Sequence, residues 1–474
     1  MTIRLYNTLT RKLEDFHPLE PGKVSFYSCG PTVYHYTHLG NLRTFLHNDF
    51  LKRMFQANGF DVRHVMNITD VGHLTNDEDD SGEDKMEKGA ARDNKSVWDI
   101  ARFYKGEFMR DFNDLNMIAP TIMPHATDYI DEQIELVQKL QDLGYTYEIP
   151  GDGIYYDTSK FAAYGALTGG SLSGNRAGAR VGFNDAKRNP SDFALWKYSP
   201  TDTKRQMEWD SPWGVGFPGW HAECSAMSMK LLGNHFDIHT GGEDLSRVHH
   251  ANEIAQSEPI TGAPWVNTWL HYSFLLDKSG EKMAKSKGEF LGMDAVRNRG
   301  YDPMVYRYFV AMGHYQSQLA FSWETMDATA KSYANLTRRV ADLLASDGAP
   351  VNQGVYTKWH DDMLAAMSDN LKTASVLVLV QDFIKSADID DATKLALVRF
   401  ADDLLGLQFI DRAQKLRALE NESAPAEIVE LAEKRAVAKT NKDWTVADAL
   451  RAEIENAGWS VIDSKDGYKI VKKA

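Results

Sequence analysis

Cysteine is almost absent from this chain of 474 residues, which contains only Cys29 and Cys224. So low a count excludes a small secreted scaffold held together by disulfides. In a reducing compartment we do not expect the two thiols to be bonded to each other, so they are either inert buried side chains or metal ligands or nucleophiles. Their separation along the chain is far from that of a zinc finger.

Long apolar runs are lacking as well. The strongest one, Val376–Val380, is much shorter than the roughly 20 residues that a membrane-spanning helix needs. The first residues contain no apolar segment followed by a small-residue cleavage site, so they do not predict a secretory signal. We therefore expect a cytoplasmic protein without a membrane partner, and we take a monomer as the default state. Its 43% apolar content and its length are typical of a globular chain of about three domains.

Excess positive charge is also missing, since the net charge is −14. That balance argues mildly against a nucleic-acid partner. The charge is uneven, however, because residues 434–474 contain nine Lys or Arg against six Asp or Glu. A basic tail on an acidic body permits a local contact with phosphates, although a solvated terminus is the simpler interpretation.

The N-terminal part shows the pattern of a βαβ unit. Val24–Cys29 reads as a buried strand, residues 42–57 carry apolar side chains at helical spacing, and Val62–Ile68 reads as a second strand. This order predicts an α/β fold with a parallel, Rossmann-like sheet, whose ligand crevice lies at the carboxyl ends of the strands. Cys29 would lie at that crevice.

The rest of the chain divides by composition. We expect a solvated acidic loop at Asn76–Lys85 and a flexible glycine-rich loop at residues 168–182. The predicted parts are the first half of the catalytic domain (1–120), an inserted connective subdomain (121–205), the second half (206–320), an α-helical bundle (321–419) and a small mixed α/β C-terminal domain (426–474).

Three kinds of metal ligand, Cys, His and Glu, occur in positions that could form one site. His249, His250 and Glu253 lie close together in sequence, and either histidine would share a helical face with Glu253. Together with Cys29 and Cys224 they would suit zinc, which accepts thiolate, imidazole and carboxylate. Spacing alone does not choose between the two histidines, and each residue taken singly is more simply explained as an ordinary core or surface group.

Three short segments suggest a nucleotide site. His38, Gly40 and Asn41 stand between the first strand and its helix, where free backbone N–H groups favour phosphate. Two lysines, Lys282 and Lys285, could neutralise charge on a triphosphate. Gly242 and Asp244 follow a strand at Phe236–His239 and could hold a ribose. Each segment has a plainer explanation, namely a helix cap, a solvated loop or a β-turn.

Together these motifs resemble the class I aminoacyl-tRNA synthetases, and specifically the cysteinyl-tRNA synthetase family. Pro31–Asn41 and Lys282–Ser286 are similar to the two signatures of the class. The parts specific to the cysteine family are stronger and extend over nearly the whole chain; they are YSCGPT at 27–32, SPWG at 211–214, PGWHAECSAM at 218–227, Asp237–Gly242, HHANE at 249–253, NITD at 67–70 and KDWTVADALR at 442–451.

The resemblance implies a zinc- and ATP-dependent ligase that joins L-cysteine to the 3′ end of its tRNA through a cysteinyl-adenylate. It implies one Zn²⁺ held by Cys29, Cys224, His249 and Glu253, with Mg²⁺ accompanying ATP. His38, Lys282 and Lys285 would be catalytic, and ATP would be bound by His38, Gly40, Asn41, Gly242, Asp244 and Lys285. We expect the substrate cysteine to be bound by Cys29, Gly30, Thr69 and Trp220.

The C-terminal tail would bind the tRNA. Trp444 could stack on an unpaired anticodon base, and Lys442 and Arg451 could meet phosphates, although Trp444 could equally pack inside the small domain. Two other functions remain open. One is a related ligase that gives cysteine to an amino-sugar, which should lack the tail, and the other is an inactive tRNA- or zinc-binding regulator.

Overall fold

A four-stranded parallel sheet forms the centre of the catalytic region. The computed structural model describes residues 2–72, 74–76, 81–169, 186–201, 204–277, 280–281, 290–344, 350–464 and 467–472. The sheet order is β12-β11-β3-β4 and every pairing is parallel. Its strands are β3 (Lys23–Ser28), β4 (Asp61–Met66), β11 (Phe236–Gly242) and β12 (Val266–Tyr272). The predicted Rossmann-like α/β fold is thus confirmed, with strand ends within two or three residues of those expected.

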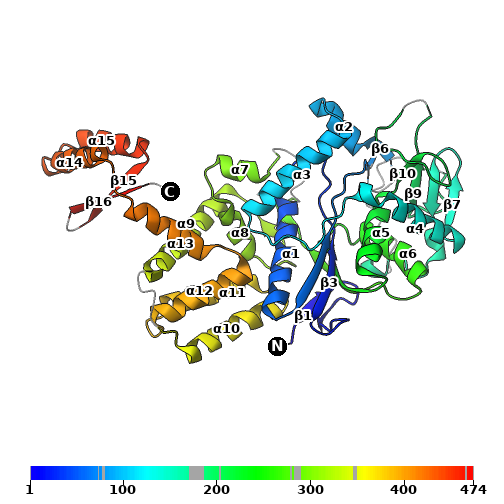
Figure 1. The fold of residues 1–474 in the computed structure, drawn as a ribbon, viewed down its shortest axis with the longest axis horizontal. Coiled ribbons are helices and arrows are strands. Elements are labelled where there is room, and N and C mark those ends of the chain that lie inside the picture. The colour runs from blue at the N-terminus through cyan, green and yellow to red at the C-terminus, as the bar shows by residue number, and fades with distance from the viewer. Residues whose placement is uncertain are drawn as a thin grey trace. The chain divides into compact units, whose positions relative to one another are not determined.

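Two crossovers run in opposite directions from the middle of this sheet. Helix α1 (Leu39–Ala57) connects β3 to β4, and α6 (His249–Thr261) connects β11 to β12. Because such crossovers are right-handed, α1 and α6 lie on opposite faces, as Figure 1 shows. α5 (Trp220–Leu232) lies on the same side as α6. The strand order reverses between β3 and β11, which is where a ligand crevice is expected.

The inserted region builds a sheet of its own. Its antiparallel order is β10-β9-β8-β7, and α4 (Ile130–Asp142) accompanies it. The strands are β7 (Thr146–Ile149), β8 (Gly153–Tyr156), β9 (Phe193–Tyr198) and β10 (Gly216–Pro218). The sheet therefore extends beyond residue 205, where the sequence predicted the insertion to end. The glycine-rich loop predicted at 168–182 lies outside the described residues from residue 170 onward.

The prediction of a solvated acidic loop at Asn76–Lys85 is wrong for most of the residues described there. β5 (Leu74–Asn76) pairs with β6 (Ser81–Asp84), and α2 (Lys85–Asp93) begins directly afterwards. The side chain of Asp84 accepts hydrogen bonds from the backbone of Met86 and Glu87 and forms an ion pair with Arg205. The acidic composition suggested a loop because the local pattern did not reveal that Asp84 caps a helix. Its basic partner, Arg205, lies far away in the sequence.

Two compact units divide the chain. The first contains residues 1–329, 361–377 and 403–406, and the second contains residues 330–360, 378–402 and 407–474. The finer division into five parts therefore stays a prediction. Within the second unit, the C-terminal segment consists of two helices and a hairpin, as expected, around a small core that includes Ile428, Ile454 and Trp459.

The bounds of the other elements are as follows. They are β1 (Arg4–Asn7), β2 (Lys12–Asp15), α3 (Val97–Asp114), η1 (Ala126–Tyr129), η2 (Thr158–Lys160), η3 (Ala166–Thr168), β13 (Leu275–Leu276), α7 (Met293–Asn298), α8 (Pro303–Ala311), β14 (Leu319–Ala320), α9 (Trp323–Leu343), α10 (Gln353–Ser368), α11 (Thr373–Lys385), α12 (Asp391–Leu405), α13 (Phe409–Asn421), α14 (Ala426–Thr440), α15 (Trp444–Asn456), β15 (Trp459–Ser464) and β16 (Gly467–Lys472). Among the described residues, no helix has the length and apolar character needed to cross a membrane.

Candidate active site

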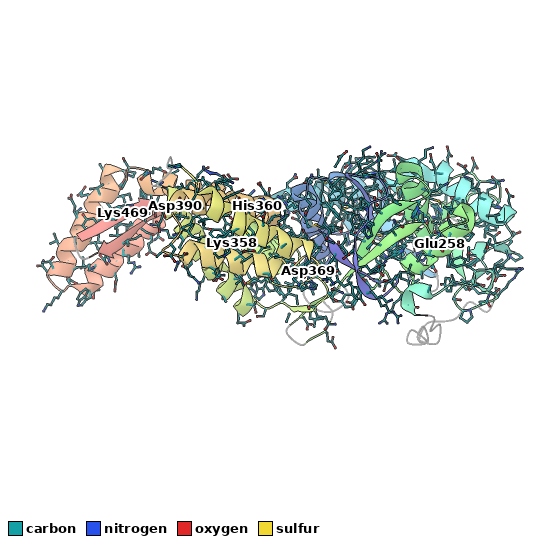
Figure 2. The ribbon with its side chains drawn as sticks, turned by 90° about the horizontal axis from the view of Figure 1, so that it is seen from below. Glu258, Lys358, His360, Asp369, Asp390 and Lys469 are labelled. Atoms are coloured by element: carbon teal, nitrogen blue, oxygen red, sulfur yellow. The ribbon has the colours of Figure 1, made fainter. Side chains whose placement is uncertain are left out.

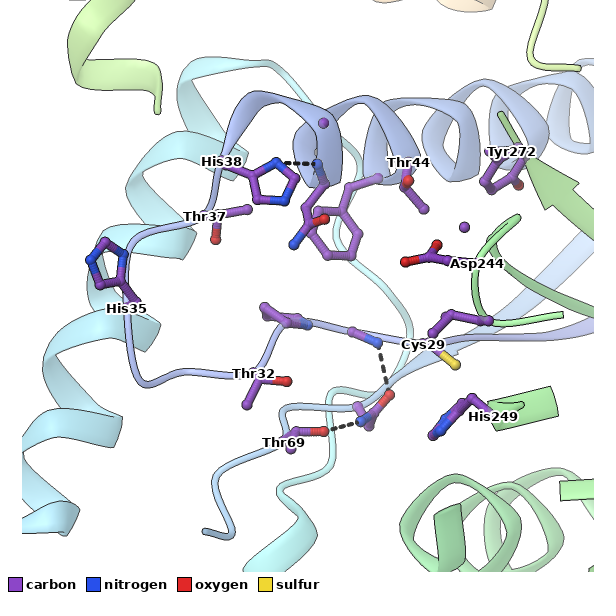
Figure 3. A pocket seen from close by; sticks show the side chains of 18 of the residues that line it. Cys29, Thr32, His35, Thr37, His38, Thr44, Thr69, Asp244, His249 and Tyr272 are labelled. Atoms are coloured by element: carbon purple, nitrogen blue, oxygen red, sulfur yellow. Dashed lines mark hydrogen bonds between the residues drawn. The ribbon is translucent and has the colours of Figure 1, made fainter. Parts of the chain in front are cut away.

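A cavity of about 250 Å³ opens at the carboxyl ends of the central strands. Figure 3 shows Cys29 and His249 at one end of it and His38, at the start of α1, at the other. The sheet brings most of the predicted site residues together here. Those that line the cavity are Cys29, Gly30, His38, Gly40, Asn41, Thr69, Trp220, Cys224, Gly242, Asp244 and His249.

Two thiols, an imidazole and a carboxylate gather at one end of the cavity. The sulfur atoms of Cys29 and Cys224 are 3.9 Å apart, and Sγ of Cys29 lies 4.0 Å from Oε1 of Glu253. Nε2 of His249 lies 3.0 Å from the same Oε1. Three separate elements supply these side chains, namely the end of β3, α5 and α6.

A second histidine, His250, also approaches this cluster. Its Nε2 lies 3.3 Å from Sγ of Cys29, and a group formed by Cys29, His239, His250 and Glu253 has its donor atoms as close together as the first group. His239 and His250 are completely buried, however, and neither lines the cavity. Cys29 belongs to both groups, but only the first group adds two further donors that line the cavity, Cys224 and His249.

The donor spacing fits a zinc ion. Four ligands at about 2.0–2.3 Å from zinc place neighbouring ligand atoms about 3.3–3.8 Å apart in a tetrahedron. The three distances given above are 3.9, 4.0 and 3.0 Å, and each lies within about 0.3 Å of that range. Thiolate, imidazole and carboxylate are also the donor types that zinc prefers. The site thus passes the test of geometry and of ligand chemistry.

The protonation of the cluster is set by burial and by mutual contacts. Burial raises the pKa of Cys29 well above its usual value. At Cys224 burial acts in the same direction, but hydrogen bonds with Cys29 and His249 outweigh it and lower the pKa to about 7. Burial opposes the charge of His249, yet Glu253 and Cys224 raise its pKa to about 10. Without a metal ion, His249 is therefore protonated at neutral pH, and its positive charge stands beside Glu253 and Cys224.

Several supporting residues were missed by the sequence analysis. Nδ1 of His221 lies 2.8 Å from Nδ1 of His249, and Nε2 of His239 lies 2.8 Å from Oε2 of Glu253. Oδ1 of Asn67 accepts a hydrogen bond from the backbone of Gly30, also drawn in Figure 3. His221, Asn67 and His239 all stand inside segments that resemble the family, so the motifs contained them, but only the fold shows what they contact.

The predicted substrate residues Gly30, Thr69 and Trp220 surround the cluster. A Cβ on Gly30 would lie 1.6 Å from the carbonyl oxygen of Asn67, so the close approach of the two chains requires glycine there. Oγ1 of Thr69 donates to Oε2 of Glu223 at 2.8 Å, and the ring of Trp220 lies 4.5 Å from that of His249.

The opposite end of the cavity is the start of α1. His38 is the N-cap residue of this helix, and its Nδ1 accepts a hydrogen bond from the backbone N–H of Asn41 at 3.3 Å. When Nδ1 accepts, the proton of the neutral ring stands on Nε2, which can then donate to an anion. A Cβ on Gly40 would lie only 2.8 Å from the His38 ring, so any larger residue at position 40 would force the ring to move.

Not every predicted residue can be placed at the cavity. Lys282 and Lys285 lie outside the described residues, so their positions stay predictions. Lys442, Trp444 and Arg451 belong to the second unit. Trp444 begins α15 with its side chain exposed, which contradicts packing inside the small domain. Figure 2 labels another basic side chain of this domain, Lys469 on β16.

The comparisons with known proteins agree with this geometry. Residues 15–331 match the family model described as the class I (C) tRNA synthetase catalytic domain. The fold is similar to that of a methionyl-tRNA synthetase from Mycobacterium tuberculosis in complex with methionyl-adenylate, with a TM-score of 0.56, 16% identity, and 85% of this chain and 94% of that one covered. Fold and site together define a class I aminoacyl-tRNA synthetase.

Full-length relatives give the particular family. The chain is 43% identical to a cysteine–tRNA ligase of Treponema denticola over 100% of both proteins. It is 44% identical to cysteine–tRNA ligase 1 of Burkholderia lata, covering 99% of this chain and 97% of that one. The chain belongs to the cysteine–tRNA ligase family.

Proposed function

We propose that this chain joins L-cysteine to the 3′ end of its tRNA, using ATP and passing through a cysteinyl-adenylate. The observation that carries the proposal is the cluster of Cys29, Cys224, His249 and Glu253 at one end of a cavity whose other end is the α1 terminus. One end suits a sulfur-seeking metal and the other suits phosphate, so a single cavity can hold both cysteine and ATP.

The amino-acid end would select the substrate. A zinc ion on the four side chains would bind the substrate's sulfur as thiolate and would bind the hydroxyl of serine far more weakly. Pocket shape alone separates such similar side chains by only about 1–3 kcal/mol. Trp220 and Thr69 would form the walls around the small side chain, with Gly30 allowing the close approach of the backbone.

The nucleotide end would promote adenylate formation. The carboxylate of cysteine attacks the α-phosphate of ATP in line, and pyrophosphate leaves. Nε2–H of His38 would donate to phosphate oxygens at the start of α1, where the helix dipole favours negative charge, while Lys282 and Lys285 would offset the developing charge. Gly242 and Asp244 would hold the ribose. Positioning and electrostatics then suffice, without a protein nucleophile.

The partners follow from this reaction. They are L-cysteine, ATP with Mg²⁺, and a cysteine-specific tRNA, whose anticodon region would contact Trp444, Lys442 and Arg451. We further propose one Zn²⁺ per chain, a monomeric state and a cytoplasmic location. The presence of the C-terminal segment from α14 to β16 favours tRNA over an amino-sugar as the acceptor.

Two assays test the proposal in sequence. Cysteine-dependent exchange of pyrophosphate into ATP should occur with the purified chain, and its absence would leave only a binding protein. Charging of cysteine tRNA should follow, and transfer to an amino-sugar in its place would identify the other ligase.

The metal site has its own test. Cys224→Ala should lose both bound zinc and cysteine activation. Ser228→Ala on the same helix removes a hydroxyl that donates only to the backbone at Cys224 and Ser225, so it should keep both. Normal activity of metal-stripped Cys224→Ala protein would defeat the assignment.

A further inference from the structure

Arg43 of α1 is buried with 1% of its surface exposed. All four of its hydrogen bonds in the described part of the chain go to backbone carbonyl oxygens. Nη1 donates to Ser273 and, at 2.7 Å, to Phe274, while Nη2 donates to His314 at 3.1 Å and to Ser317 at 2.6 Å. One guanidinium thereby connects α1 to two other segments that are far from it in sequence.

One of these segments lines the cavity, and the other leads to a strand that pairs beside it. Ser273 and Phe274 follow β12 and line the cavity. Residues 314–317 lead into β14, which pairs in parallel with β13, the strand just before the lysine-containing segment 282–286. Oγ of Ser273 lies 2.9 Å from the backbone oxygen of Gln316 and 2.6 Å from Oε2 of Glu243, so its one proton has two acceptors at this junction.

The start of α1 is also connected to the chain that follows the lysine-containing segment. The backbone N–H of Leu39 donates to the carbonyl of Leu291 at 2.9 Å, and His38 forms a β-bridge with Gly292. Helix α1 therefore has two attachments around the lysine-containing segment. Arg43 holds it to Ser273 and Phe274, which precede that segment, and His38 and Leu39 hold it to Leu291 and Gly292, which follow it.

Burying a charged guanidinium to hold backbone segments together carries a large desolvation free energy. Taking its charge out of water costs several kcal/mol, and carbonyl oxygens offset this only in part. Burial lowers the pKa of Arg43 to about 10, which still leaves it charged at neutral pH. Its positive charge remains close to the end of the cavity where ATP phosphates would bind.

We propose that Arg43 is a positioning residue for adenylate formation, which fixes the His38 helix, the Ser273–Phe274 wall and the approach to the lysine-containing segment in one arrangement. The inference rests on the proposed function. Arg43 touches neither substrate. It acts through the backbones that it holds, so its loss should affect the rate of the chemical step more than the binding of cysteine.

Arg43→Lys tests this directly. Lysine keeps the positive charge, but its compact ammonium has only three donors and lacks the planar, forked geometry with which arginine donates to four carbonyl oxygens. We expect kcat for cysteine-dependent pyrophosphate exchange to fall at least about tenfold, since small misplacements of reacting groups cost rate steeply. The KM for cysteine should change less than about twofold, because the zinc-ligand cluster does not contact Arg43.

The matched control is Arg307→Lys. Arg307 is equally buried and donates to the carbonyls of Leu405 and Leu115. It also pairs with the carboxylate of Asp49 farther along α1, but, unlike Ser273 and Phe274, none of these partners lines the cavity. It should lose thermal stability while kcat per folded molecule stays unchanged. An equal loss of kcat in both variants, or none in Arg43→Lys, overturns the inference.

A second variant covers the case in which Arg43→Lys does not fold. Ser273→Ala removes only the hydroxyl at the same junction and should lower kcat about threefold with an unchanged KM for cysteine, a factor set by one lost hydrogen bond. Unchanged kcat in that variant also overturns the inference. If the unmodified chain shows no exchange, it is the proposed function that fails.

Discussion

Nδ1 of His221 lies 2.8 Å from Nδ1 of His249, and this contact directs the other nitrogen of His249 toward Glu253. Both histidines are buried, and they come from neighbouring helices, α5 and α6. Either Nδ1 can donate in this contact; when Nδ1–H of a neutral His249 donates to His221, Nε2 of His249 is left with a lone pair for a metal ion. His221 would therefore orient the proposed ligand His249 without being a ligand itself.

His221→Asn should weaken zinc binding about 10- to 100-fold, the usual effect of removing the partner of a metal-bound histidine. A competition titration with a chromophoric chelator measures this. His235→Asn is the control, because His235 is exposed and contacts Asn267. Equal zinc affinity in the two variants would show that His221 has no orienting role.

Gly40→Ala should separate stability from activity. Alanine favours a helix over glycine by about 1 kcal/mol, so the melting temperature should not fall greatly. Its Cβ would displace the His38 ring, however, and kcat for pyrophosphate exchange should drop at least about tenfold.

The control for that substitution is Gly106→Ala in the exposed part of α3. A Cβ there would meet nothing within 4 Å, so stability should rise and activity should stay the same. If Gly40→Ala kept full exchange activity, the position of the His38 ring would not matter for adenylate formation.

Trp444→Ala should reduce charging of cysteine tRNA while leaving pyrophosphate exchange intact. An exposed indole that stacks on a base contributes about 1–3 kcal/mol, so we expect kcat/KM for tRNA to fall about tenfold. Trp444→Phe keeps an aromatic face and should retain most of the activity. Similar charging by the alanine and phenylalanine variants would remove stacking as the role of this side chain.

The C-terminal domain should become less stable in acid. Asp463 binds the guanidinium of Arg435 through two contacts of 3.0 Å, and hydrogen bonds from Arg435 and Lys439 hold the pKa of Asp463 well below its usual value. A lowered pKa in the folded state stabilises the domain above about pH 4, where the unfolded carboxyl is also ionised. That contribution is lost as the pH falls through the folded-state pKa.

Asp463→Asn should accordingly cost about 1 kcal/mol at neutral pH, because the carboxylate is partly exposed and screened. Hydrogen exchange at α14 and β15 in the full-length chain reports this locally. Glu430→Gln breaks an exposed pair with Lys434 and should change exchange by much less. Identical protection in both variants would contradict the prediction.

The sequence predicted three of the four central strands, at Val24–Cys29, Val62–Ile68 and Phe236–His239, because apolar and β-branched side chains concentrate there. It did not identify β12. It could not choose between His249 and His250 by spacing, since both lie within one helical turn of Glu253. The structure shows why: both Nε2 atoms approach the cluster, and what separates the two residues is which one faces the cavity.

Contacts between segments distant in sequence were out of reach of the local pattern. The pairing of Asp84 with Arg205 turned an expected loop into a strand and a helix cap. Arg43 stands in the segment predicted as a helix, where no local pattern marks it, and it is buried among carbonyls that the chain supplies more than two hundred residues later. Such residues are recognised only when the fold brings their partners to them.

The four donors of the cluster are spread from position 29 to position 253. During synthesis on the ribosome, the last of them emerges only after more than half of the 474-residue polypeptide has been made. Before that moment the nascent chain has no complete coordination sphere, so an ion acquired early would be held by at most a fragment of it. If these four side chains bind zinc as proposed, metallation would be completed only after residue 253 has been made.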